Sequence, residues 1–410
     1  MAAAGTGTGR ARVPGPPAGA NLPALRSHNM ALVLDLLRTA AAEGISRLEL
    51  AERTGLTPQA VSKITARLRA DGLATEAGRR ASTGGKPRTV LRLVPEAAHA
   101  VGVHLDRDEL RAVVVDLTGA VVGELRTSLD LGSGADAVVG AVAREVEGLV
   151  GRALRGAGSA ADAPQLLNAP AGTGSLLDTG TGSSRGPGTG TASLLGVGVA
   201  LPGPLDHTRG VLHRVTGFPE WDGFPLRDAL ARRLGVPVVV DKDTNAAALG
   251  LAVAGEGGSF AYLYLGTGLG AGLVIGGTVH RGVRTGAGEF GHQVILLDGP
   301  PCGCGNRGCV EALCLGAVAR GDVAEAARVL GAGAANLAGL LDIDLVLLGG
   351  RTVATAPEAF VQGVAAVLDE RARRVGEDPV PVRVAPGGGR EVAQGAAQLL
   401  LAPLFGRADG

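Results

Sequence analysis

One short glycine-rich segment of the chain carries a histidine and three cysteines. Cys302 and Cys304 are separated by one glycine, and Cys309 follows five residues after Cys304. Glycine at positions 303, 305 and 308 allows tight turns with positive φ, which would fold Cys309 back toward the other two thiols. Thiolate and imidazole are the ligands of tetrahedral structural zinc sites, and His292 would complete the set. The segment therefore predicts a Zn²⁺ site formed by His292, Cys302, Cys304 and Cys309.

Two alternatives for this segment are a group of buried free thiols and a disulfide. Three cysteines with glycine-filled gaps disfavour the free thiols, and a disulfide is less favoured still. Because metal binding energy becomes folding energy, a zinc ion would give a fixed shape to a coil too rich in glycine to hold itself.

Further motifs surround the cysteines in a fixed order. A glycine-rich run at 266–277 precedes Glu289-Phe290-Gly291-His292, and the other motifs are Leu-Pro-Gly-Pro-Leu-Asp at 201–206, Asp-Lys-Asp-Thr-Asn at 241–245 and Leu-Gly-Gly at 348–350. With this set the chain resembles the ROK family of bacterial repressors and sugar kinases, from about residue 27 to residue 400. The resemblance implies an α/β fold with a two-lobed, actin-like (ribonuclease-H-like) ATPase architecture. It also implies a cleft that binds a sugar, with zinc holding one wall.

The length of 410 residues and an apolar fraction of 46% predict two or three domains with sizeable cores. No membrane span is predicted, because the uncharged run at 257–280 is dense in glycine and fits two buried strands better. Residues 1–20 lack the apolar core of a signal peptide. Reduced thiols at a metal, without an export signal, predict a cytoplasmic protein.

Positive charge is concentrated near the N-terminus. Residues 21–95 contain twelve Arg or Lys against six Asp or Glu, a net charge of +6, whereas the whole chain has a net charge of zero. The rest of the chain is therefore acidic. A basic first segment on an acidic body predicts a polyanion partner for that segment only.

Apolar spacing and capping residues predict three helices in this basic segment. The first covers 30–39, Ser46 caps the second, and Gly55 ends it. Thr57 caps the third helix, with Pro58 in its first turn. The residues that fit a helix-turn-helix core are Ala51, Gly55, Val61 and Ile64, with Leu68 continuing the apolar spacing.

The opposite face of the third helix carries polar and basic side chains that can reach base edges and phosphates in a major groove. These predicted DNA contacts are Gln59, Ser62, Lys63 and Arg67, and the alternative is an ordinary solvated helix face. Residues 79–94 predict two strands joined by a glycine turn, the wing of a winged helix-turn-helix, with Lys86 and Arg88 as further DNA contacts. ROK repressors carry Gly-Arg-Pro at the wing tip. Lys86 keeps the charge but lacks the planar guanidinium that suits a narrow minor groove.

The remaining chain predicts the body. Short β-rich runs at 101–105, 110–117 and 121–125 and an amphipathic helix at 135–154 fit the first part of an actin-like lobe. Residues 157–193 consist mostly of Gly, Ala, Ser, Thr and Pro, which predicts a disordered insertion. The predicted division is a disordered tail at 1–22, a winged helix-turn-helix at 23–95 and a ROK sugar-kinase-like domain at 96–405.

Predicted strands at 194–201 and 236–240 deliver loops to the cleft. The family's Asn-Asp-x-Asn motif holds the general base of the kinases, and the resemblance assigns that position to Asp243. Lys242 replaces the asparagine that contacts the sugar. The resemblance further implies that sugar hydroxyls would be bound by Asp243, Glu289, His292 and Glu311. The alternative is a set of surface acids beside a structural metal.

The kinase pattern fails at the phosphate-binding turn. The family's Asp-x-Gly-Gly-Thr turn reads His104 to Asp108 here, so both glycines are missing. Asp106 and Asp108 would repel phosphate, and Arg107 cannot restore the lost backbone room. The segment between Glu311 and residue 348 is also shorter than the family usually has. Phosphotransfer is therefore predicted to be lost, with Asp243 a vestigial general-base position and no catalytic residue expected.

These features predict a DNA-binding transcriptional repressor, not an enzyme, whose ROK domain senses a sugar or a sugar derivative. Operator DNA read as paired half-sites predicts a homodimer or a dimer of dimers. One alternative is an active sugar kinase that also binds DNA, and another is a DNA-binding scaffold without a ligand. Lys242 beside the pocket predicts a preference for acidic or phosphorylated sugars.

Overall fold

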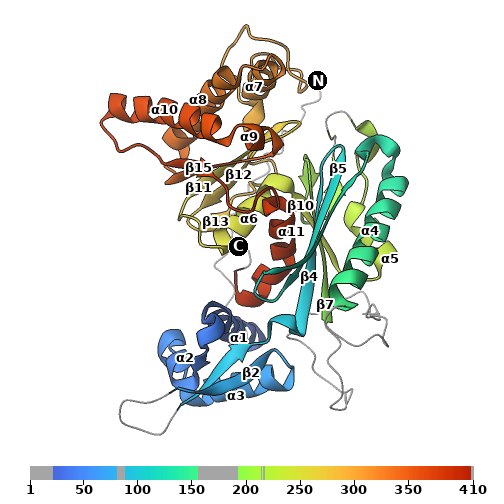
Figure 1. The fold of residues 1–410 in the computed structure, drawn as a ribbon, viewed down its shortest axis with the longest axis vertical. Coiled ribbons are helices and arrows are strands. Elements are labelled where there is room, and N and C mark those ends of the chain that lie inside the picture. Colours follow the sequence, from blue (N-terminus) through green and yellow to red (C-terminus); the bar gives the residue numbers. More distant parts are fainter. Residues whose placement is uncertain (1–21, 81–87, 156–192, 214, 216–217, 408–410) are drawn as a thin grey trace, which may run out of the picture.

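The computed structural model describes residues 22–80, 88–155, 193–213, 215 and 218–407. The predicted disordered segments at 1–22 and 157–193 lie outside these residues apart from Leu22 and Ser193, and so does Lys86. A small N-terminal unit lies beneath a larger two-lobed α/β body (Figure 1). The predicted fold class is confirmed.

The N-terminal unit is a winged helix-turn-helix. It contains α1 Leu22–Thr39, η1 Ala41–Glu43, β1 Ile45–Ser46, α2 Arg47–Thr54, α3 Pro58–Ala70, β2 Ala74–Arg80, β3 Arg88–Leu93 and η2 Pro95–Ala97, with sheet order β1-β3-β2. The helix α2 begins with a capping box between Ser46 and Glu49 and ends at Gly55, whose φ is 69°. Thr57 caps α3 through the amide of Ala60. The first helix begins eight residues before the predicted start at residue 30.

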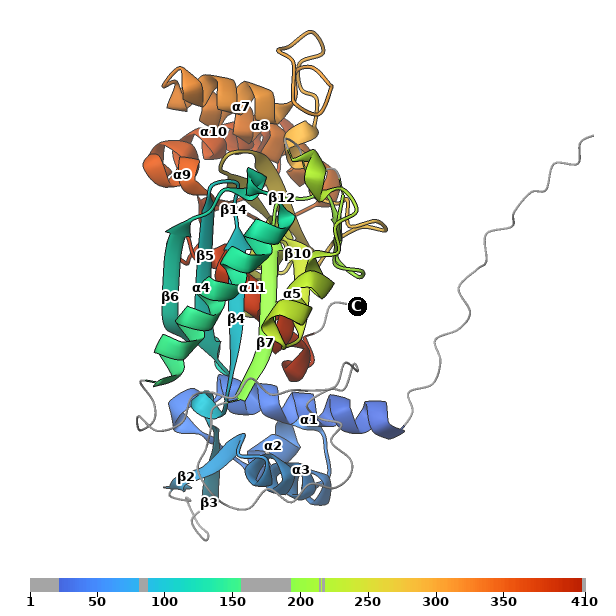
Figure 2. The same ribbon diagram turned by 90° about the vertical axis from the view of Figure 1, so that its right-hand side faces the viewer.

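The first lobe is a five-stranded sheet in the order β10-β7-β4-β5-β6. Helices α4 and α5 cover one of its faces (Figure 2), and the apolar residues between them form a continuous core. The elements are β4 Ala98–Leu105, β5 Glu109–Asp116, β6 Val121–Ser128, η3 Leu131–Ser133, α4 Ala135–Arg155, β7 Ser193–Leu201, β8 Leu205–Asp206, β9 Val211–Leu212, η4 Pro219–Trp221, α5 Leu226–Leu234 and β10 Val238–Lys242.

The second lobe is another five-stranded sheet, in the order β13-β12-β11-β14-β15. Its outer face packs against α7, α8 and α10 in a second apolar core. The elements are β11 Phe260–Leu265, β12 Leu269–Ile275, β13 Thr278–Val279, η5 Phe290–His292, α7 Val310–Ala319, α8 Val323–Leu341, β14 Leu345–Gly349, α9 Arg351–Thr355, α10 Pro357–Val375 and β15 Val382–Val384. None of the helices within the described residues is both long and apolar enough to cross a bilayer.

Two helices, α6 Asp243–Val253 and α11 Glu391–Leu401, lie between the lobes (Figure 1). They pack with almost no space between them, because a Cβ on Gly395 would lie 1.9 Å from the carbonyl oxygen of Ala246. A Cβ on Gly198 of β7 would likewise lie 1.8 Å from the carbonyl oxygen of Ala396. Glycine at these positions therefore lets the joint between the lobes form.

The N-terminal unit and the body share a core. Residues of α1 cluster with residues of β4, β5, α11 and the short helix η6 Ala402–Phe405. The guanidinium of Arg38 lies 5.0 Å from the ring centroid of Phe405, and Arg407 Nη2 lies 3.2 Å from Asp35 Oδ2. The C-terminal end of the chain is thus part of the support for α1.

Candidate functional site

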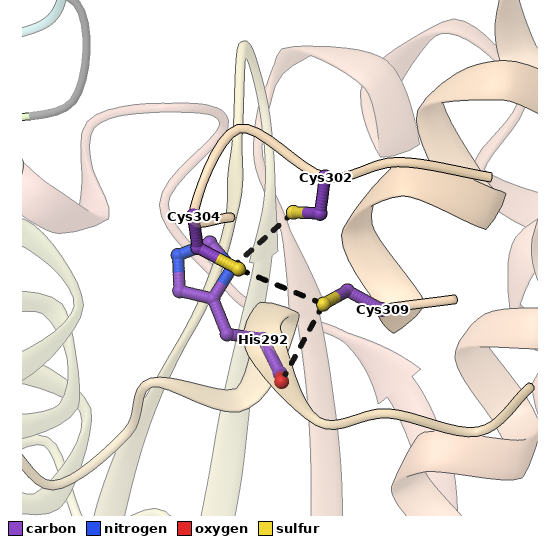
Figure 3. Close-up of side chains that lie close together, drawn as sticks. All are labelled: His292, Cys302, Cys304 and Cys309. Atoms are coloured by element: carbon purple, nitrogen blue, oxygen red, sulfur yellow. Dashed lines mark hydrogen bonds between the residues drawn. The ribbon is translucent and has the colours of Figure 1, made fainter. Parts of the chain in front are cut away.

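The side chains of His292, Cys302, Cys304 and Cys309 lie close together (Figure 3). Their ligand atoms all lie within 4.8 Å of one another. The sulfur atoms of Cys304 and Cys309 are 3.7 Å apart, as are Cys302 Sγ and His292 Nδ1. Two sulfurs at about 2.3 Å from a tetrahedral zinc ion would lie about 3.8 Å apart. The four side chains therefore fit Zn²⁺, and they fill all four positions of a structural site.

The backbone of this loop is held by two of the three glycines named from the sequence. Gly305 and Gly308 have φ of 92° and 64°, whereas Gly303 does not adopt a positive φ. A Cβ on Gly308 would lie 1.6 Å from the carbonyl oxygen of Leu296, so no other residue fits there. Cys309 is the N-cap residue of α7, and the amide of Val310 donates to Gln293 O at 2.9 Å. This hydrogen bond ties the second half of the loop to the residue after His292.

Asp243 lies at the start of α6, where the lobes meet, and is buried. Its Oδ1 accepts a hydrogen bond of 2.7 Å from the amide of Thr244. The pKa of Asp243 is raised to about 6, mainly by burial and to a smaller extent by the carboxylates of Asp106 and Glu289. The hydrogen bond from Thr244 and the charge of Lys242 act in the opposite direction. A carboxyl group with such a pKa can accept or hold a proton near neutral pH.

Lys242 and Glu289 form an ion pair beside Asp243. Lys242 Nζ lies 2.6 Å from Glu289 Oε1 and donates a second hydrogen bond of 3.0 Å to the carbonyl oxygen of Ala287. The lysine side chain is only 4% exposed, whereas that of Glu289 is 45% exposed. From the sequence, Lys242 is the candidate cation that offsets repulsion among the carboxylates, and the structure pairs it with Glu289.

Glu311, the fourth predicted effector residue, is engaged near the metal ligands. Its Oε2 accepts a hydrogen bond of 2.8 Å from the amide of Leu269, and Cys302 Sγ lies 3.9 Å from its Oε1. Lys242, the residue before Asp243, thus contacts Glu289. Glu311 and His292 lie at the cysteine loop instead. The assignment of these four residues to a sugar effector stays a prediction.

Sequence reasoning missed a buried ion pair that involves the neighbour of Lys242 in the chain. Arg281 Nε lies 2.7 Å from Asp241 Oδ2, and both side chains are less than 10% exposed. Asp241 Oδ1 also accepts from Asn245 Nδ2 at 3.1 Å. The ion pair connects Arg281, in the loop before Glu289, to Asp241 at the end of β10. The position of Asp241 at a strand end was the one signal available.

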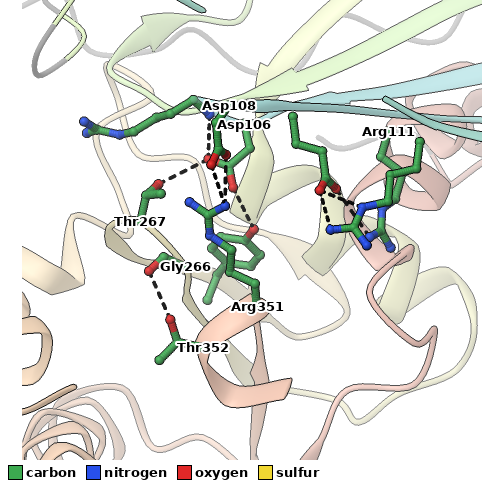
Figure 4. Close-up of polar contacts among 11 residues, drawn as sticks. Asp106, Asp108, Arg111, Gly266, Thr267, Arg351 and Thr352 are labelled. Atoms are coloured by element: carbon green, nitrogen blue, oxygen red, sulfur yellow. Dashed lines mark hydrogen bonds and ion pairs between the residues drawn. The ribbon is translucent and has the colours of Figure 1, made fainter. Parts of the chain in front are cut away.

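The turn between β4 and β5 bridges the two lobes (Figure 4). Arg351 Nη1 lies 2.9 Å from both carboxylate oxygens of Asp108, and Thr267 Oγ1 donates to Asp106 Oδ1 at 3.2 Å. Arg107 points elsewhere, with its guanidinium 5.5 Å from the ring centroid of Phe218. The two acids of this turn are therefore used in contacts with the second lobe.

The predicted recognition face is exposed. Gln59, Ser62, Lys63 and Arg67 of α3 all face solvent, and so does Arg88 at the start of β3. Val61 and Leu68 are fully buried on the opposite face, as predicted. Arg67 Nε lies 3.6 Å from Asp71 Oδ2 in an exposed ion pair. Such a pair is weak, so a DNA phosphate could take the place of Asp71.

A winged helix-turn-helix joined to a two-lobed, actin-like body with a His/Cys cluster defines the class of protein. The ROK family model matches residues 188–322, and a winged helix-turn-helix DNA-binding model matches residues 34–75. The matched segments of the chain are thus similar to the ROK family in the body and to winged helix-turn-helix DNA-binding proteins at the N-terminus.

Relatives include both regulators and kinases. The xylose repressor of Bacillus subtilis (strain 168) is 27% identical over 270 residues, which cover 65% of this chain and 61% of that protein. The glucokinase of Thermotoga maritima is 41% identical over 122 residues, 28% of this chain and 38% of that enzyme. The chain thus spans about three fifths of the length of the repressors that it matches.

A solved ROK family transcriptional regulator, described as a homolog of the E. coli MLC protein, has the same fold. Its TM-score is 0.68 at 19% identity, and the match covers 93% of this chain and 98% of that one. The match extends over the winged helix-turn-helix as well as the body.

Proposed function

We propose that this protein is a DNA-binding transcriptional repressor whose body binds a sugar or a sugar derivative and does not transfer phosphate. The observation that carries the proposal is the exposed polar and basic face of α3 on a winged helix-turn-helix. The similarity to the xylose repressor of Bacillus subtilis also supports a repressor function. A half-site is the natural target of one such unit, so the active form is a homodimer or a dimer of dimers on a palindromic operator.

Loss of phosphotransfer is supported by the turn between β4 and β5. A phosphate needs free backbone N–H groups and positive charge. This turn instead presents Asp106 and Asp108, whose carboxylates already hold Thr267 and Arg351. His104 adds no charge, because burial lowers its pKa to about 4.

Zn²⁺ is the metal we assign to His292, Cys302, Cys304 and Cys309, on the fit of their sulfur and nitrogen atoms. When bound it would fix the loop that carries the residues between η5 and α7. Four protein ligands leave no open position for a reacting water.

The test of DNA binding is a titration of labelled duplex from the gene's own upstream region, against a scrambled duplex of equal length. Lys63→Ala should weaken operator binding about tenfold, because a phosphate or base contact is lost from α3. Binding should also fall steeply with salt, since each phosphate contact releases counterions.

Arg328→Ala is the matched control. It removes the same charge from α8, at the opposite end of the molecule from α3 (Figure 1), and should leave operator binding unchanged. Equal affinity for operator and scrambled DNA would refute the repressor assignment.

A second candidate function is a sugar kinase that also binds DNA. It is favoured by one observation, the buried carboxyl of Asp243 with its pKa near 6, which suits a general base. A coupled assay with ATP and a panel of hexoses and amino sugars decides between the two. Turnover that disappears in Asp243→Asn would establish the kinase.

A further inference from the structure

Lys242 is a buried cation at the centre of the proposed effector site. Its side chain is 4% exposed, and its ammonium group lies against Glu289 and the carbonyl oxygen of Ala287. The stem of the side chain fills the space beside the loop at 202–204, because a Cβ on Gly203 would lie 3.2 to 3.3 Å from three of its carbons. The lysine therefore occupies room between that loop and the loop that ends at Glu289.

The acceptors of this ammonium group are held in place independently of it. Gly288 has φ of 82°, and a Cβ there would lie 2.0 Å from the carbonyl oxygen of Ala271. The amide of Ala271 donates to Gly288 O at 2.9 Å. Glu289 directly precedes the short helix that ends at His292, one of the four predicted metal ligands. Ala287 O and Glu289 thus belong to a rigid, preformed edge that could equally accept hydrogen bonds from a ligand.

A buried ammonium group without a partner is strongly destabilising, so Lys242 stays on these acceptors while nothing competes for them. Glu289 differs, because its side chain is nearly half exposed and water can solvate it when the lysine leaves. The pair is therefore asymmetric. The lysine depends on the glutamate more than the glutamate depends on the lysine.

We propose that Lys242 is an internal occupant of the effector site, whose ammonium group takes the hydrogen bonds of Glu289 and Ala287 O that a sugar hydroxyl takes when the effector binds. This inference rests on the proposed function, since it assumes that the effector site lies at Glu289. The effector must displace the lysine, so the site selects neutral polyhydroxy ligands that bind well enough to compete. This reverses the preference for acidic or phosphorylated sugars that we expected from the sequence. An acidic sugar gains little from Lys242, because Glu289 already neutralises its charge and Asp243 lies nearby.

The first experiment is calorimetric titration of the full chain with glucose, xylose and glucuronate. Lys242→Met removes the competing ammonium group at similar volume, and Lys242→Gln serves as a second variant should the first fold poorly. We expect at least tenfold tighter binding of a neutral sugar by these variants than by the wild type. Arg284→Met is the matched control, an exposed cation in the same loop region, and should leave the affinity unchanged.

The second experiment uses the small number of lysines, which occur at 63, 86 and 242. Brief acetylation followed by peptide mass spectrometry should modify the exposed Lys63 and spare Lys242. A saturating neutral sugar should raise labelling of Lys242 at least threefold relative to Lys63. Sugar binding that leaves Lys242 protected would overturn the proposal, as would unchanged or weaker sugar affinity in both lysine variants.

Operator affinity, measured with and without sugar, separates this inference from the proposed function. Tighter sugar binding by the lysine variants without any effect on operator affinity would support the internal occupant and refute the sugar-responsive repressor. If wild type and variants released the operator at equal sugar concentrations, the sugar-responsive repressor would be supported and the internal occupant refuted. No binding of any sugar by any folded variant would overturn both the inference and the sugar part of the function.

Discussion

The carboxyl group of Asp243 illustrates how burial changes the chemistry of one residue. Its pKa of about 6 lies above the ordinary value of 3.8, mainly because the ionised form loses its hydration. Between about pH 4 and pH 6, Asp243 is therefore protonated in the folded state and ionised in the unfolded chain. Folding stability contributed by this residue is present at low pH and is lost as the pH rises through that window.

Asp243→Asn should consequently stabilise the protein at pH 7.5 by up to about 3 kcal/mol, because asparagine mimics the protonated carboxyl and can still accept from Thr244 N. At pH 4 the substitution should have little effect. Urea unfolding at the two pH values measures this, and an equal effect at both would contradict the raised pKa.

Cys304 and Cys314 differ in what surrounds them, although both are cysteines of the same lobe. Cys304 is exposed and lies 3.7 Å from Cys309 Sγ, whereas Cys314 is buried in α7 and donates to Ala326 O. Cys304→Ser should abolish zinc binding and lower the midpoint of thermal unfolding. Cys314→Ser should retain one zinc per chain. Elemental analysis of freshly purified, reduced protein is the measurement, and metal-free wild type would refute the site.

At the scale of elements, the position of α11 depends on glycines in its neighbours. The helix crosses β4 and β7 where Gly102 and Gly198 replace side chains, and it meets α6 at Gly395. Because α6 begins with Asp243 and α11 leads into η6, which packs against α1, this layer connects the proposed effector site to the DNA-binding unit. Its close packing makes it a stiff connection.

Gly198→Ala should destabilise the protein by about 3 kcal/mol, because its Cβ would lie 1.8 Å from the carbonyl oxygen of Ala396 and the helix would have to move. Gly140→Ala in α4 is the control. Its nearest neighbour is the flexible end of Arg144 at 3.5 Å, so it should be neutral or stabilise by up to about 1 kcal/mol. Chemical denaturation of the two variants should therefore give effects of opposite sign or very different size.

At the scale of the whole molecule, the two lobes are bridged by side chains of the turn between β4 and β5, where the sequence lacks the glycines expected of a phosphate-binding turn. Arg351 pairs with Asp108, and Thr267 and Tyr264 lie within hydrogen-bonding distance of Asp106. The Asp108 pair is exposed, so it contributes at most about 1 kcal/mol to stability. The consequence of this pair is electrostatic, because Asp108 neutralises the charge of Arg351, which is then not available to a phosphate group.

Saturating Mg²⁺ and ATP should therefore leave the melting temperature of the protein unchanged. Asp108→Asn releases Arg351 without restoring the missing glycines, so it should not create nucleotide binding either. Differential scanning fluorimetry tests both statements, with a ROK glucokinase as the positive control. A shift of several degrees in the wild type would reopen the kinase assignment.

Local sequence determined the parts of this protein whose signals lie in adjacent residues. Ser46 and Thr57 fix the starts of α2 and α3 because a capping side chain reaches amides two or three residues away. The cysteine spacing likewise confines three of the four predicted zinc ligands to one loop. Tertiary structure alone decided the pairings across the cleft. Lys242 and Glu289 are 47 residues apart, and Asp108 and Arg351 are 243 apart. No spacing rule operates at such separations, so these contacts arise only when the two sheets and α6 pack together.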